Sequence, residues 1–148
     1  VRFLKKNKNL QFSEANIIVV ENAIITLQKI ATHHRRKFDI PVIGITGSNG
    51  KTIVKEWLYH ILRSEFNIVR SPKSYNSQFG AALTLLSIRE NHQLAIVETG
   101  ISKPGEMSLM KKMIQPSHVI LSNIGNEHLE NFNSIDELRL EKEKILEN

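Results

Sequence analysis

Four residues in a glycine-rich stretch of the chain are of the types that bind phosphate. Gly47, Gly50, Lys51 and Thr52 occur in the stretch GITGSNGKT, which follows a short apolar run and precedes apolar residues at helical spacing. In a phosphate-binding loop, backbone N–H groups converge on phosphate oxygens at a helix N-terminus, a lysine bridges the outer phosphates and a hydroxyl ligates Mg²⁺. The usual motif has another glycine five residues before Gly50, where this chain has Ile45. We interpret the stretch as a phosphate-binding loop, the alternative being a tight glycine turn with a solvated lysine.

Composition restricts the class of protein and its chemistry. The 148 residues contain 41% hydrophobic side chains and no cysteine, which suits one globular domain and excludes a disulfide framework, a thiolate zinc site and a cysteine nucleophile. The net charge is +5, but the basic clusters at 5–8 and 33–37 are not interleaved with aromatics, so we expect no nucleic-acid partner. The apolar runs are too short to cross a bilayer and the first residues lack a signal-peptide pattern, so we expect a cytoplasmic protein without membrane insertion.

A phosphate loop requires a strand before it and a helix after it, and the rest of the sequence contains more elements of both kinds. Short apolar runs rich in β-branched residues alternate with helical patterns, which is typical of βα units on a parallel sheet. The predicted strands cover residues 17–20, 42–46, 67–70, 94–98 and 119–122. We predict the α/β fold class, with a phosphate-loop-containing, mostly parallel sheet that is flanked by helices and incomplete at the C-terminus.

Five helical patterns lie between and after these strands. The first predicted apolar face consists of Ile24, Leu27, Ile30 and Ala31, and the second of Val54, Trp57, Leu58, Ile61 and Leu62. Further helices are predicted over residues 78–89, 104–114 and from 134 to the C-terminus. Pro104 suits a first helical turn, and Ser134 with Glu137 forms a capping box. We expect Trp57 in the core rather than on the surface as a stacking platform.

The two ends of the sequence differ from its middle. Residues 1–20 have a polar start rich in lysine and asparagine and a single predicted strand, and we interpret them as the tail of a preceding substrate-binding domain. Residues 21–148 form the predicted central domain, and no strand follows its last helix. We therefore expect the sequence to be a fragment of a longer protein.

Several motifs together resemble one enzyme family. The segment from Thr46 to Thr52 resembles the variant phosphate loop of the Mur ligases, the ATP-dependent amide-forming enzymes of peptidoglycan synthesis, in which Ile45 is expected. Further matching segments follow in order over 75–80 (YNSQFG), 83–86, 98–100 (ETG), 104–106 (PGE) and 122–130 (SNIGNEHLE). The VKE after Thr52, the PGE and the HLENF are similar to the MurF type. The resemblance covers residues 17 to 148 and, as an ordered set, is more specific than a phosphate loop alone.

The resemblance implies a reaction, its cofactors and its substrates. The γ-phosphoryl group of ATP would pass, with Mg²⁺, to the terminal carboxylate of UDP-MurNAc-tripeptide, and the amine of D-Ala-D-Ala would attack the resulting acyl phosphate. Phosphoryl transfer depends mainly on placing charges and holding them. A fused alanine racemase elsewhere in the protein stays open. The resemblance assigns ATP binding to Thr46, Gly47, Ser48, Asn49, Gly50, Lys51, Thr52 and Asn123.

The same resemblance implies roles for residues at other strand ends. Lys51 would offset charge on the outer phosphates and Thr52 would ligate Mg²⁺. Glu98, at the carboxyl end of a predicted strand, would be a metal ligand, and His128 would ligate a second metal as a neutral imidazole. Asn123 would orient the histidine loop, and Asn76 would face the muramyl-peptide substrate.

A lysine on the last predicted helix matches a further family feature. In several Mur ligases the lysine after the histidine loop is carbamylated and becomes an anionic metal ligand, and Lys142 has the matching position. Without this resemblance, Lys142 would be read as one half of a surface ion pair with a nearby glutamate.

Alternatives stay open for the other residues and for the function. Glu98 could be a surface carboxylate, His128 a solvated loop histidine and Asn76 a residue chosen for turn geometry. The chain could come from another Mur ligase, from a folylpolyglutamate synthase or from a nucleotide-binding module that does not turn over. We expect weak or no ligation by these 148 residues alone.

Overall fold

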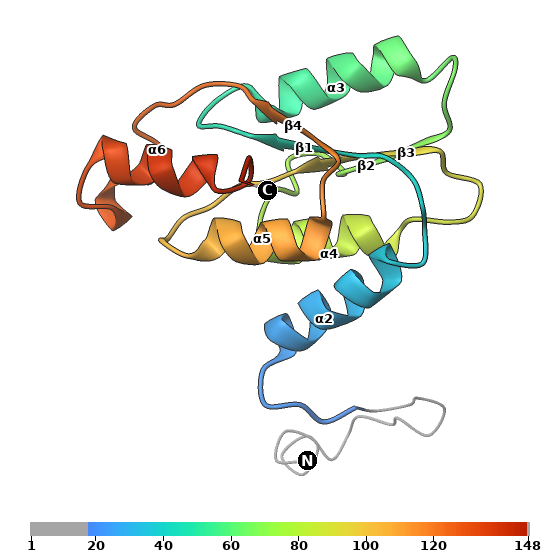
Figure 1. Ribbon diagram of the computed structural model, residues 1–148, viewed down its shortest axis with the longest axis horizontal. Helices are drawn as coiled ribbons and strands as arrows, with labels where there is room; N and C mark the ends of the chain where they lie inside the picture. The colour runs from blue at the N-terminus through green and yellow to red at the C-terminus, as the bar shows by residue number, and fades with distance from the viewer. Residues whose placement is uncertain (1–17, 148) are drawn as a thin grey trace, which may run out of the picture.

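The computed structural model describes residues 18–147, which form a four-stranded parallel sheet with helices on both faces (Figure 1). The elements in chain order are α2 (Ala23–Arg35), β1 (Val42–Thr46), α3 (Lys51–Leu62), β2 (Ile68–Arg70), α4 (Gln78–Leu86), β3 (Leu94–Glu98), α5 (Glu106–Ile114), β4 (His118–Leu121), the 3₁₀-helix η1 (Leu129–Asn131) and α6 (Ile135–Glu143). The predicted α/β class with a parallel sheet is confirmed. Among residues 18–147, no helix is both long and apolar enough to pass through a bilayer.

The order of the strands brings their carboxyl ends together. The sheet runs β2-β3-β1-β4, and every neighbouring pair is parallel. Ile45 lies opposite Glu98 on β3 and opposite Ile120 on β4. The chain therefore leaves β1, β3 and β4 at the same edge of the sheet, which is where open α/β sheets bind their ligands.

The pleat of the strands decides which residues meet which helix. On β3, Leu94 and Ile96 belong to the core under α3, whereas Ala95 and Val97 belong to the core shared with α4 and α5. Side chains alternate between the two faces of a strand, so Glu98 shares the α3 face with Leu94 and Ile96. Figure 1 shows α3 alone on one side of the sheet and α4 with α5 on the other.

Helix α3 turns one stripe toward the sheet and leaves another exposed. Val54, Leu58 and Leu62 pack on the sheet, and Lys51 and Lys55 are buried in the same stripe. The prediction that Trp57 lies in the core is wrong, because its side chain is 67% exposed. Its apolar neighbours on that side, Ile53 and Ile61, are exposed as well. The apolar surface of α3 is therefore wider than the stripe that packs on the sheet.

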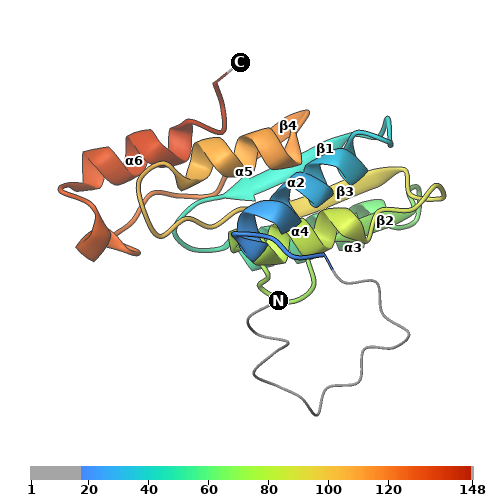
Figure 2. The ribbon, with the colours of Figure 1, turned by 90° about the horizontal axis from the view of Figure 1, so that it is seen from below.

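The N-terminal predictions are only partly met. Ile17 and the residues before it lie outside the described residues, and 18–20 are exposed and not part of a strand. They precede α2, which packs on α4 and α5 and not on a sheet edge, so they have no neighbouring strand to pair with (Figure 2). Because α2 packs only on these two helices, it buries a narrow face. Leu27 and Ala31 contact the core, whereas Ile24 and Ile30 are exposed.

The capping residues in the sequence predict the start of α6 correctly but not that of α5. The Ser134 side chain accepts a hydrogen bond from the Glu137 N–H at 3.1 Å, as the capping box predicts, while the Glu137 carboxylate binds the N–H of Asn133. Pro104 does not begin α5, because Gly105 takes a left-handed conformation with φ 85° and the helix begins at Glu106. The Glu106 carboxylate accepts hydrogen bonds from the N–H groups of Ser102 and Lys103 and so closes the turn after β3.

Candidate nucleotide-binding site

The glycine-rich loop connects the end of β1 to the start of α3, as the sequence predicts. Gly47 has φ 134°, and a Cβ atom there would lie 2.1 Å from the Ser122 hydroxyl, so only glycine fits. Gly50 is the N-cap of α3 with φ 82°, and no side chain caps this helix end. The first N–H groups of α3 are therefore available to an anion at the positive end of the helix.

The segment after β4 holds the loop in place. The N–H of Ser48 donates to the Asn123 carbonyl at 3.0 Å, and the N–H of Asn49 donates to the Asn123 side-chain oxygen at 2.8 Å. The Ser122 hydroxyl donates to the Asn49 carbonyl at 2.6 Å, and the Ser48 hydroxyl is paired with the backbone of Gly125. Asn123 thus contacts the glycine-rich loop directly, through two of the loop's N–H groups.

Lys51 lies folded across the loop. Its buried ammonium group donates to the carbonyls of Gly47 and Ser48 at 2.7 and 2.9 Å and to the Glu127 carboxylate at 3.1 Å. These contacts hold a cation beside the start of α3, where phosphate oxygens of a nucleotide would sit.

Glu98 and Thr52 bring two oxygen ligands together. Glu98 is fully buried at the carboxyl end of β3, so it is not a surface carboxylate. The Thr52 hydroxyl donates to Glu98 Oε2 at 3.1 Å. The Lys55 ammonium group lies 2.9 Å from Glu98 Oε1. One carboxylate oxygen therefore faces a buried ammonium group and the other faces the first turn of α3, beside the phosphate loop.

His128 is positioned by a tight turn between β4 and η1. Its backbone is left-handed with φ 61°, and its side chain is 41% exposed. The ring nitrogens lie 3.8 Å from carboxylate oxygens of Glu127 and of Glu130. Since Glu127 also accepts from Lys51, the histidine turn and the phosphate loop are linked through this one carboxylate.

Lys142 lies beside the loop and not on the surface. It is 2% exposed on α6, and its ammonium group lies 3.3 Å from the Ser48 hydroxyl and 3.8 Å from Glu127. Burial, and to a lesser degree the nearby Lys51 ammonium, lower the pKa of Lys142 to about 8. At pH 7 about a tenth of this amine is therefore unprotonated, far more than of an exposed lysine.

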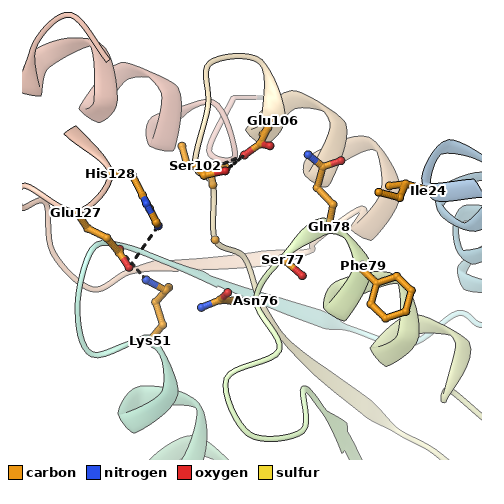
Figure 3. Close-up of a pocket in the computed structure, with 12 residues that line it drawn as sticks. Ile24, Lys51, Asn76, Ser77, Gln78, Phe79, Ser102, Glu106, Glu127 and His128 are labelled. Carbon is orange, nitrogen blue, oxygen red and sulfur yellow. Dashed lines mark hydrogen bonds and ion pairs between the residues drawn. The ribbon is translucent and has the colours of Figure 1, made fainter. Parts of the chain in front are cut away.

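A cavity of about 490 Å³ opens next to the loop (Figure 3). Figure 3 shows Lys51, Glu127 and His128 at one end of it, and Ile24 and Phe79 at the other. Asn76 lines this cavity and also the smaller hollow of about 260 Å³ over the phosphate loop. The Asn76 carbonyl accepts from the N–H of Gly100 at 2.6 Å, so the segment after β2 is fastened to the end of β3.

The candidate residues form two neighbouring groups. Thr52 with Glu98 forms one, and Glu127, His128 and Lys142 form the other, with Lys51 between them. Among residues 18–147, no three histidine, aspartate or glutamate side chains gather closely enough to hold a metal ion by themselves. Any divalent cation here would need oxygen atoms of a nucleotide or of water to complete its coordination.

Sequence reasoning did not assign roles to Lys55 and Glu127, although both residues lie in matching motifs. Lys55 is four residues after Lys51, and this spacing places both lysines on the inward stripe of α3. A lysine within an inward apolar stripe is the signal that could have identified it. For Glu127, the only sequence signal is its position next to His128.

Comparison with known proteins gives a family match. The model of the Mur ligase middle domain matches residues 45–148. The UDP-N-acetylmuramoyl-tripeptide–D-alanyl-D-alanine ligase of Borreliella burgdorferi is 34% identical over 146 residues, which is 99% of this chain and 30% of that protein. The enzyme of the same name from Bacillus subtilis is 32% identical over 128 residues, 84% of this chain and 28% of that protein. The chain thus spans less than a third of the length of these two relatives.

This chain is also similar, in architecture and in sequence, to solved structures. MurF from Acinetobacter baumannii superimposes with a TM-score of 0.83 and 32% identity over 89% of this chain and 30% of that chain. The MurF ligase of Thermotoga maritima, solved in complex with ADP, superimposes with a TM-score of 0.80 and 30% identity over 93% of this chain and 32% of that chain.

Proposed function

The chain belongs to the Mur ligase family, and from this premise we propose that it is the ATP-binding part of a UDP-N-acetylmuramoyl-tripeptide:D-alanyl-D-alanine ligase. The observation that carries the proposal is the pairing of Thr52, in the first turn of α3, with the buried Glu98 at the end of β3. Binding a nucleotide needs the loop alone, whereas activating its terminal phosphoryl group also needs a fixed carboxylate beside the loop. The names of the most similar relatives support the MurF type.

The residues of the loop would divide the work of binding ATP. The uncapped N–H groups of α3 would bind phosphate oxygens, and Lys51 would exchange the carbonyls of Gly47 and Ser48 for the outer phosphates. Asn123 would hold the backbone of the loop in place by accepting hydrogen bonds from the N–H groups of Ser48 and Asn49. The structural similarity to the Thermotoga maritima ligase, which was solved in complex with ADP, supports nucleotide binding by this chain.

The donor set at Thr52 and Glu98 fits Mg²⁺. Both side chains offer oxygen, which is the ligand type that Mg²⁺ prefers, and a site with one carboxylate leaves room for phosphate and water. The bound ion would neutralise charge that develops on the transferred phosphoryl group. Glu98 would hold one oxygen in a fixed place for it, and Thr52 would contribute its hydroxyl.

Lys142 and His128 would serve a second cation next to the first. The neutral amine of Lys142 can attack the carbon of CO₂, which forms an N–C bond, breaks one C=O π bond and, after a proton is released to solvent, leaves a carbamate anion in place of the neutral amine. The pKa near 8 supports this reaction, because only the unprotonated amine is nucleophilic. The carbamate would then lie close to the Ser48 hydroxyl. The Glu127 carboxylate, which is 3.8 Å from both Lys142 and His128, would lie between the carbamate and the histidine.

The substrates would approach through the cavity beside the loop. Asn76, like Lys51, lines both this cavity and the hollow over the phosphate loop, which suits a residue that faces the carboxylate accepting the phosphoryl group. The terminal carboxylate of UDP-MurNAc-tripeptide would lie there, and the amine of D-Ala-D-Ala would attack the acyl phosphate that forms.

We also propose that the 148 residues act within a longer, cytoplasmic protein. Residues 1–20 would end a preceding substrate-binding domain and 21–148 would belong to the central domain, which agrees with the share of each relative that the chain covers. These 148 residues alone would then ligate weakly or not at all.

The experiment is ADP release by the full-length protein with ATP, Mg²⁺ and UDP-MurNAc-tripeptide. ADP release that requires D-Ala-D-Ala supports the proposal. Release that requires a single amino acid instead would indicate another Mur ligase, and glutamate-dependent release with a folate acceptor would indicate a folylpolyglutamate synthase. Nucleotide binding without turnover under any of these conditions would leave a non-catalytic nucleotide-binding module as the function.

A further inference from the structure

Lys55 is a fully buried cation that the proposed reaction does not yet use. Its side chain is 0% exposed, and its ammonium group lies 2.9 Å from Glu98 Oε1 and 3.1 Å from Glu56 Oε1. It also donates to the carbonyl of Ser71 at 2.8 Å and to that of Lys73. Removing an ammonium group from water is costly, so a lysine is retained at such a place only with partners that satisfy it, as here.

The fold brings Lys55 to Glu98 through two separate periodicities. On α3, Lys55 follows Lys51 by four residues and so faces the sheet in the same stripe. On β3, Glu98 shares the α3 face with Leu94 and Ile96. Ser71 follows β2, the neighbour of β3, and its hydroxyl accepts a hydrogen bond from the N–H of Glu98 at 3.0 Å.

The two oxygens of the Glu98 carboxylate have different partners. Oε1 accepts no hydrogen bond from the described residues and is held only by the ion pair with the Lys55 ammonium group at 2.9 Å, whereas Oε2 accepts from the Thr52 hydroxyl at 3.1 Å. Because Lys55 is anchored by two carbonyls and by Glu56, the carboxylate cannot rotate without separating a buried ion pair. Only Oε2 is turned toward the loop.

We propose that Lys55 is a positioning residue for the metal site: it holds Glu98 Oε1 and leaves Oε2 as the single carboxylate oxygen available to a divalent cation. The inference rests on the proposed function, since it takes Glu98 as the ligand. It also assigns a role to the VKE motif, Val54 to Glu56, because Lys55 of that motif pairs both with Glu98 and with Glu56.

This arrangement has a consequence for metal selectivity. Mg²⁺ requires near-octahedral geometry and is bound through single carboxylate oxygens, whereas Ca²⁺ readily accepts both oxygens of one carboxylate. A Glu98 whose Oε1 is withheld disfavours Ca²⁺. If Lys55 loses its charge, Oε1 becomes free and Ca²⁺ gains a second ligand atom that Mg²⁺ does not use.

The test compares the affinity of the full-length protein for ADP at saturating Mg²⁺ and at saturating Ca²⁺, measured by calorimetry. Lys55→Met has similar length and no charge, and we expect it to shift the ratio of the two Kd values toward Ca²⁺ by about tenfold. The matched control is Arg70→Met, because Arg70 pairs with the other end of the network, at Glu56, and forms no hydrogen bond or ion pair with Glu98. We expect it to leave the ratio unchanged.

The outcomes separate the inference from the proposed function. An unchanged ratio in Lys55→Met overturns the inference and leaves the proposed function standing, whereas a wild-type protein that binds no ADP with Mg²⁺ overturns both. If Lys55→Met does not fold, a crystal structure of the wild-type protein with Mn²⁺ and ADP decides. One Glu98 oxygen on the metal, with Lys55 still on Oε1, supports the inference, and two oxygens on the metal overturn it.

Discussion

The ammonium group of Lys142 lies 3.3 Å from the hydroxyl of Ser48, although the two residues are 94 positions apart in the chain. This contact brings the last helix against the phosphate loop, with Glu127 between the lysine and Lys51. A lysine buried beside another cation is unfavourable as an ammonium ion, and this property leads to the first two predictions.

The first prediction concerns a covalent change at Lys142. We expect the full-length wild-type protein, equilibrated with ¹³C-bicarbonate near pH 8, to show a carbamate carbon signal by NMR, because about half of this amine is unprotonated there. Lys142→Met should lose the signal. The control is Lys144→Met, since Lys144 is paired with Glu141 and more exposed. A signal that survives Lys142→Met would assign the carbamate to another residue.

The second prediction concerns stability as a function of pH. Folding lowers the pKa of Lys142 from 10.5 to about 8, so between these values the unfolded state binds more protons than the folded state. Stability contributed by this group therefore rises with pH through that window. Relative to Lys142→Met, the free energy of unfolding of the wild-type protein should increase by up to about 3 kcal/mol across it. Urea denaturation in CO₂-free buffer measures the difference, and a difference that stays flat with pH would contradict the buried-amine assignment.

The third prediction concerns Glu98. In the full-length protein, Glu98→Gln should lower turnover by about 100-fold or more while changing ATP affinity much less, because in the proposed function the carboxylate holds the cation that neutralises charge on the transferred phosphoryl group. Glutamine is preferable to alanine, since it fills the volume beside the buried Lys55. Steady-state kinetics with nucleotide-binding titrations measure both quantities. Turnover equal to that of the wild-type protein would remove Glu98 from the site.

The fourth prediction concerns His128. Its side chain is 41% exposed, and its ring nitrogens have only contacts of 3.8 Å with carboxylates, so His128→Ala should change the free energy of unfolding by about 0.5 kcal/mol or less. Turnover of the full-length protein should nevertheless fall far more than ATP affinity. His33→Ala, at an exposed position of α2, is the control and should leave both unchanged. Equal activity of the two variants would argue that His128 is a solvated loop residue.

The fifth prediction uses two glycines that both have positive φ angles. Gly47→Ala should abolish ADP binding, because the new Cβ would lie 2.1 Å from the Ser122 hydroxyl and displace the loop. Gly105→Ala, at φ 85°, would have no atom within 4 Å of its Cβ, so it should cost about 1 kcal/mol of stability and leave ADP binding intact. Calorimetric titration with ADP and thermal unfolding distinguish the two. Unimpaired ADP binding by Gly47→Ala would speak against this loop as the phosphate site.

Features that depend on neighbouring residues could be predicted from the sequence. The bounds of β1 and β3, the glycine loop between β1 and α3, and the Ser134 cap of α6 all match their predictions. Alternation, helical spacing and capping act over a few residues, so a short window contains the whole signal. The order of the motifs was also sufficient to indicate the family.

Features that depend on which distant segments meet required the tertiary structure. The sequence did not predict that Lys55 would pair with Glu98, that Asn123 would bind the N–H groups of the phosphate loop or that Trp57 would be exposed. The strand order β2-β3-β1-β4 decides these contacts, because it sets the face of the sheet that α3 covers and the strand ends that share one edge. Lys142 illustrates the same division: its position on a helix follows from local periodicity, but its burial against Ser48 follows only from the packing of α6 beside the loop.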